Sequence, residues 1–135
     1  MSPTERTLRW LRKQGYTADV VERRLPHSFV TKDLFGCLDI VAIKDGSLGV
    51  LGLQVTSAAH FAERIKKVEA EPRAKLFHDC GNTLWVVGWS KQGSKGKRKL
   101  WVPTVKAMWH EEPTHESEWN LRAIVTPIPF CTLPA

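Results

Sequence analysis

The feature that most constrains this chain is a carboxylate inside an almost entirely apolar stretch, Asp39 within residues 37–43. A short apolar run containing β-branched residues predicts a buried strand. An ionised carboxylate inside such a strand is costly unless it is paired or bound to a cation. Asp39 is therefore the first candidate functional residue, although an acid at a strand end can also serve only to cap a loop amide.

The residues that follow predict a partner strand for Asp39. Residues 44–47 form an Asp-Gly turn signal, and residues 49–55 are again apolar. Together they predict a β-hairpin. Because side chains alternate along a strand, Gln54 and Thr56 share one face. We expect Asp39, Gln54 and Thr56 to meet at the end of a sheet, unless the last two are ordinary polar positions.

The other segments predict the fold class α/β, with a mixed central β-sheet flanked by helices. A capping-box signal at residues 2–5 begins a helix that ends at Gly15. Further helices are expected at 58–68, 72–80 and 104–109, strands at 16–25, 83–89, 100–102 and 120–126, and an irregular link at 27–36. The length fits one domain over residues 1–135, with a core at 2–90 and a C-terminal extension at 91–135.

The charge balance favours a polyanionic partner. Twenty Lys and Arg residues against fourteen Asp and Glu residues give a net charge of +6. Residues 90–99 combine small residues with five cations, which are Lys91, Lys95, Lys97, Arg98 and Lys99. Such a loop can follow a phosphate backbone. The alternative is a solvated hairpin loop.

Composition argues against several other classes of protein. No apolar run approaches the roughly 20 residues of a membrane helix, and the N-terminus lacks a signal-peptide core. We therefore expect a cytoplasmic protein with no membrane partner. Cys37, Cys80 and Cys131 show no Cys-x-x-Cys spacing and are expected to be free, mostly buried thiols. The histidines lack a His-x-x-x-His pair, which argues against zinc.

The order of these segments resembles the PD-(D/E)XK (restriction-endonuclease-like) nuclease superfamily, particularly its Holliday-junction-resolvase-like and phage-encoded branches. Three elements carry the resemblance: a helix ending in Gly15-Tyr16, a Gly-x-x-Asp element at residues 36–39, and Gln54-x-Thr56 in place of the family's Glu-x-Lys. The resemblance covers residues 2–90. It implies a core of order αβββαβ.

The resemblance also implies a set of catalytic residues, namely Asp39, Gln54, Thr56 and Glu5. Of these, Asp39, Glu5 and Gln54 would hold Mg²⁺ or Mn²⁺, which activates water against a phosphodiester. Glu5 has an alternative role in the capping box of the first helix. In that case Asp33 or Glu22 could replace it as a ligand.

Two departures from the family pattern concern Gln54 and Thr56. An amide oxygen is a weaker ligand for a hard cation than a carboxylate, so we expect weak metal binding. Thr56 cannot supply the positive charge of the family's lysine, and losing such a group costs ~10²–10³ in rate. Together the two replacements leave the net charge of the site unchanged. Arg64 or Lys67 in the next helix could supply the cation and contact DNA, or could be solvated helix charges.

Three functions remain open from the sequence. The first is a metal-dependent DNA endonuclease or junction-resolving nuclease with an atypical active site, acting on duplex or branched DNA. The second is a catalytically inactive nuclease-fold DNA-binding module, and the third is a protein-interaction factor. Because resolvases of this superfamily act as dimers, a homodimer is expected by analogy. The six tryptophans are expected mostly in the core or an interface, with stacking on bases as the alternative.

Overall fold

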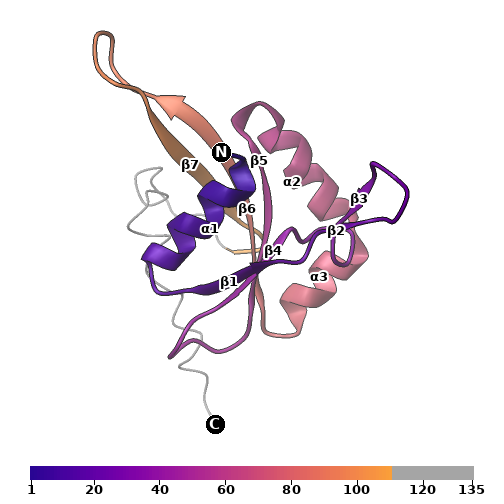
Figure 1. Ribbon diagram of the computed structural model, residues 1–135. Helices are drawn as coiled ribbons and strands as arrows, with labels where there is room; N and C mark the ends of the chain where they lie inside the picture. The colour runs from indigo at the N-terminus through magenta and orange to yellow at the C-terminus, as the bar shows by residue number, and fades with distance from the viewer. Residues whose placement is uncertain (111–135) are drawn as a thin grey trace.

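A computed structural model of the protein describes residues 1–110, so Cys131 and the strand expected at 120–126 lie outside the described residues. The described part is a mixed α/β fold, as predicted, with a five-stranded sheet of order β1-β4-β5-β6-β7 (Figure 1). Strands β5 and β6 run parallel, and the other neighbours are antiparallel. The strands are β1 (Thr17–Val20), β4 (Ile40–Ile43), β5 (Leu51–Ser57), β6 (Thr83–Gln92) and β7 (Leu100–Ala107).

Helices cover both faces of this sheet (Figure 1). The elements are α1 (Pro3–Lys13), the short 3₁₀ turn η1 (Ala58–His60), α2 (Phe61–Ala70) and α3 (Pro72–Asp79). Helix α1 begins at the predicted capping box, in which Ser2 and Glu5 bond each other's backbone N–H groups. None of the helices within residues 1–110 is long and apolar enough to cross a bilayer.

The sheet has an apolar core on each face, one beneath α1 and the other beneath α2 and α3. The first joins α1 to alternate residues of the sheet, among them Leu53 and Val55 of β5. The second joins α2 and α3 to the opposite face, with Val68 and Ala74 fully buried. A side chain at Gly52 would place its Cβ 2.6 Å from Leu38 Cδ2, so the glycine permits the close packing of this second layer.

The segment between α1 and β4 differs from the prediction. The expected strand at 16–25 ends at Val20, because Val21 N and Glu22 N both donate to the Asp39 carbonyl, at 2.9 and 3.3 Å. The chain then leaves the sheet and forms a two-stranded ribbon of β2 (Arg23–Arg24), at the end of the expected strand, and β3 (Thr31–Lys32), within the expected link. Strand β4 begins at Ile40, so Asp39 directly precedes the strand in which it was predicted.

The prediction for residues 100–109 is wrong in one part. The expected helix at 104–109 is instead a continuation of β7, which runs from Leu100 to Ala107 through Pro103. Proline is tolerated there because β7 is an edge strand of the described sheet, and its missing N–H costs no ladder hydrogen bond on the open side. The cysteine prediction holds for Cys37, which is buried, but Cys80 is exposed.

Candidate carboxylate site

Asp39 lies where β4 begins, against the C-terminal half of β5. Its backbone N–H donates to the Leu53 carbonyl at 2.8 Å, and its side chain is only 4% exposed. One carboxylate oxygen, Oδ2, accepts the Val55 backbone N–H at 2.9 Å and also the Gln54 side-chain amide. The meeting of Asp39 and Gln54, predicted from strand alternation, is therefore confirmed.

Two further carboxylates complete the carboxylate cluster, which consists of Glu22, Asp33 and Asp39. One oxygen from each lies within 4.8 Å of the others, so the group could hold a metal ion. Glu22 comes from the bend between β1 and β2, where its N–H bonds Asp39, and Asp33 directly follows β3. The sequence named these two acids only as possible replacements for Glu5.

Two carboxylates of the cluster, Asp33 and Asp39, share a proton. Burial, followed by a hydrogen bond with Asp33, raises the pKa of Asp39 to about 8, and the charge of Glu22 acts in the same direction. Burial also raises the pKa of Asp33, but hydrogen bonds with Asp39 and Lys67 outweigh burial and lower it overall. Near neutral pH a protonated Asp39 thus donates to an ionised Asp33, as expected for like charges that cannot both be ionised cheaply at close range.

Helix α2 places positive charge beside the cluster. Lys67 Nζ lies 2.9 Å from Asp33 Oδ2, and the charge of Arg64 also lowers the pKa of Asp33. The Asp33 side chain is 11% exposed and the Lys67 side chain 42%, so this ion pair sits at the mouth of the cluster. Lys67 is therefore not simply a solvated helix charge.

Gln54 and Thr56 follow each other along the same face of β5. Both are buried, and the Gln54 oxygen Oε1 has no hydrogen-bond partner among the described residues. A buried acceptor is costly unless a water, an ion or a ligand pairs with it. Thr56 makes no hydrogen bond to Asp39 and lies two residues further along β5.

Glu5 is not brought to the cluster. Its carboxylate accepts the Ser2 N–H at 3.0 Å in the capping box of α1, and α1 packs on the face of the sheet opposite α2. Glu5 therefore has the alternative role, that of a helix cap, and α1 adds no carboxylate to the cluster. The main difference from the predicted site is that Glu22 and Asp33, and not Glu5, lie beside Asp39.

The basic loop joins two strands that extend far from the body of the protein (Figure 1). Its five cations are exposed; Lys91 is still part of β6, and the other four lie in the turn before β7. On β7, the exposed ring of Trp101 lies beneath the Arg6 guanidinium, at 3.6 Å from ring centroid to Cζ. Trp85 and Trp89 are buried against Trp10, so the expected core role is confirmed for these two tryptophans.

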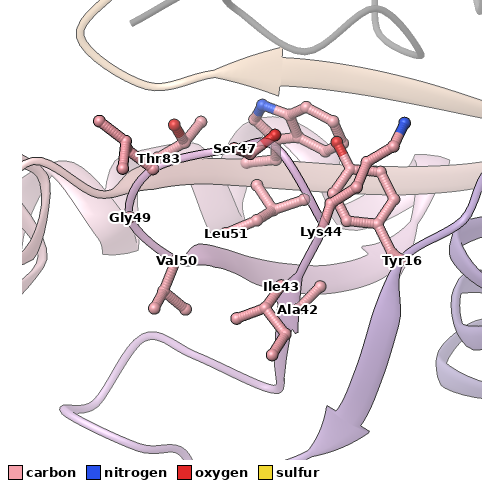
Figure 2. Close-up of a pocket in the computed structure, with 11 residues that line it drawn as sticks. Tyr16, Ala42, Ile43, Lys44, Ser47, Gly49, Val50, Leu51 and Thr83 are labelled. Carbon is pink, nitrogen blue, oxygen red and sulfur yellow. The ribbon is translucent and has the colours of Figure 1, made fainter. Parts of the chain in front are cut away.

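A separate cavity lies near the turn between β4 and β5, away from the carboxylates (Figure 2). It has a volume of about 30 Å³, enough for roughly one water molecule. Its lining is mainly apolar, and Lys44 Nζ lies 5.0 Å from the centroid of the Tyr16 ring at its edge. With no carboxylate in its lining and so little space, it is not a candidate catalytic site.

No family model, curated protein or solved structure matches this chain.

Proposed function

We propose that this protein is a metal-dependent DNA endonuclease or junction-resolving nuclease with an atypical active site. The observation that carries the proposal is the carboxylate cluster, in which Glu22, Asp33 and Asp39 meet beside a buried amide and a lysine. Three convergent acids at a strand end, of which Asp33 and Asp39 have a perturbed pKa, form the kind of site in which catalytic groups are found.

The residues of the cluster fit a divalent cation. Two oxygens that ligate one cation from opposite sides are separated by twice the metal–oxygen distance. For Mg²⁺ this oxygen–oxygen separation is about 4.2 Å. The three carboxylates, all within 4.8 Å of one another, match this spacing after small side-chain movements. Asp39, Asp33 and Glu22 would hold the ion, and the unpaired Gln54 Oε1 offers a fourth oxygen once the amide rotates. The bound cation would supply Lewis-acid activation of water and phosphate.

The remaining polar residues have roles that follow from their positions. Lys67 lies where it can stabilise the negative charge that develops on a phosphate beside Asp33. It takes the place of the lysine that Thr56 replaces, while the Thr56 hydroxyl would order water or a phosphate oxygen. Val55 N–H fixes the orientation of Asp39. Mg²⁺ and Mn²⁺ are the cations we expect, because all the donors are oxygens.

DNA is the partner that the charge distribution favours. Residue Val86 of β6 lies level with Gln54 in the parallel register, and β6 continues to Gln92 in the direction of the Asp39 end of the sheet. Six further residues extend the strand by about 20 Å. Along the strand direction, the basic loop therefore lies beyond the level of the carboxylate cluster, and there Lys95, Lys97, Arg98 and Lys99 could follow a phosphate backbone.

One observation favours the second function, an inactive nuclease-fold module that binds DNA. Gln54 presents its Nε2 donor to Asp39, and a donor repels a cation. If the amide keeps this orientation, the proton on Asp39 and the charge of Lys67 offset much of the negative charge of the cluster without any metal. DNA binding through the basic loop would then persist without cleavage.

Cleavage assays separate these functions. The full chain is incubated with branched, duplex and single-stranded DNA in Mg²⁺ or Mn²⁺, alongside Asp39→Asn and Asp33→Asn. Asp79→Asn serves as the matched control, because this exposed acid of α3 pairs with Lys75 away from the cluster. The proposal requires cleavage by the wild type and the control, and loss of cleavage in both cluster variants.

The other outcomes each support a different function. Binding of DNA without cleavage by any of the four proteins supports the inactive module. Cleavage that survives Asp39→Asn contradicts the proposed site. Absence of DNA binding at low salt leaves the protein-interaction factor as the remaining function, with the basic loop as its contact for an acidic partner.

A further inference from the structure

The ribbon formed by β2 and β3 carries two like charges directly opposite each other. Arg23 and Lys32 are register partners across the two strands, and both are exposed. Opposed side chains in an antiparallel pair lie about 4.5–5.5 Å apart at Cβ, and like charges there are destabilising. Neither residue forms an ion pair with any acid in residues 1–110.

These two cations line a cleft next to the carboxylate cluster. The cleft has a volume of about 230 Å³, and its walls include Arg23, Lys32, Arg73 and Asp33. Arg73 is oriented by Glu71, whose carboxylate accepts two hydrogen bonds from the Arg73 guanidinium. Asp33 belongs both to this cleft and to the cluster, so a group bound in the cleft would lie beside the cluster.

We propose that this cleft binds a backbone phosphate of the DNA substrate, next to the phosphate that is cleaved. The inference rests on the proposed function in that it takes DNA as the ligand. The volume is below the roughly 300–1,000 Å³ of pockets for whole small molecules and leaves room for a phosphodiester group beside Arg23 and Lys32. An anion between Arg23 and Lys32 would remove the like-charge repulsion that the ribbon otherwise carries.

The binding test uses the full chain in EDTA, so that its result does not depend on cleavage. Affinity for a labelled DNA duplex is measured over a series of NaCl concentrations for the wild type and for the double variant Arg23→Gln/Lys32→Gln. The control is Lys13→Gln/Lys44→Gln, which removes two cations at the end of α1 and in the turn after β4. Circular dichroism checks that each variant is folded.

We expect the double variant to bind duplex roughly ten-fold more weakly than the control variant. Its slope of log K against log [NaCl] should become less negative by about 0.9, corresponding to one lost phosphate contact. An unchanged slope, an equal loss in the control, or no DNA binding by the wild type would each overturn the proposal.

The result is distinguishable from that of the proposed function. A selective loss of binding in the double variant, with no cleavage by the wild type in Mn²⁺, supports the phosphate cleft and contradicts the nuclease. Cleavage by the wild type, with identical salt slopes for wild type and double variant, contradicts the cleft and supports the nuclease.

Discussion

Replacing Asp39 with asparagine is expected to stabilise the cation-free protein increasingly as the pH rises. Burial, together with the hydrogen bond to Asp33, raises the pKa of Asp39 from 3.8 to about 8. Between these values the folded chain holds a proton that the unfolded chain has released, so the free energy of unfolding falls as the pH rises. Asparagine can donate to Asp33 and accept from Val55 N–H, as protonated Asp39 does, without this dependence.

The size of the effect follows from one proton. A difference of one proton changes the free energy of unfolding by 1.36 kcal/mol per pH unit, so the wild type should lose at most about 2.7 kcal/mol between pH 5 and pH 7. The lowered pKa of Asp33 acts below this window, since its stabilisation is complete above its unfolded pKa. His110, whose pKa burial lowers, contributes equally to wild type and variant and cancels in their difference.

Urea unfolding of the full chain, followed by tryptophan fluorescence without divalent cations, measures this difference. The stability of Asp39→Asn minus that of the wild type should grow by up to about 2.7 kcal/mol from pH 5 to pH 7. For Asp79→Asn, the difference should not change between pH 5 and pH 7, because this exposed acid is ionised in both the folded and the unfolded chain over that range. Parallel pH dependence of the wild type and Asp39→Asn would refute the reasoning.

Added Mn²⁺ should reverse the order of stability. A cation that displaces the shared proton stabilises only the folded state that can ligate it. We therefore expect Mn²⁺ to raise the melting temperature of the wild type and of Asp79→Asn, and to leave that of Asp39→Asn unchanged. An equal rise in all three proteins would place the bound ion elsewhere.

Three further substitutions test the packing, the lysine and the exposed ribbon loop. Gly52→Ala brings a methyl group to 2.6 Å from Leu38 Cδ2 and should lower the free energy of unfolding by roughly 1–3 kcal/mol in urea; an unchanged midpoint would contradict the close packing. Lys67→Gln should slow cleavage in Mn²⁺ by ~10²–10³, whereas Lys66→Gln, an exposed neighbour, should not; equal rates would remove Lys67 from the site. Phe29 lies between β2 and β3 and is 94% exposed, so Phe29→Ala should leave the stability of the fold unchanged. The variant should bind single-stranded DNA about ten-fold more weakly in a fluorescence titration, because base stacking on the ring is lost. An unaltered affinity would exclude that contact.

Local signals in the sequence were enough for the elements around Asp39. The capping box at Ser2 and Glu5 fixes the start of α1, because both of its hydrogen bonds span only three residues. The strand alternation of β5 and its antiparallel pairing with β4 bring Gln54 to Asp39, since one short connection sets the register. These parts of the fold and of the site depend on neighbours in the chain.

The prediction for residues 100–109 was wrong because the position of a strand in the sheet decides whether it can continue through a proline. A strand was expected to end at residue 102, yet β7 continues through Pro103 to Ala107. Proline is excluded from central strands but not from an edge, and the edge position of β7 is a property of the whole sheet. No pattern within residues 100–109 carries that information.

The sequence by itself determined that a buried acid, Asp39, must be compensated, because an apolar strand cannot hold a free charge. Only the tertiary structure decided which groups compensate it. Glu22 and Asp33 reach it from loop positions whose path depends on the ribbon and on α2, while Glu5 stays in its own helix cap on the other face. Contacts between distant segments follow from packing of the layers, and a local motif does not specify them.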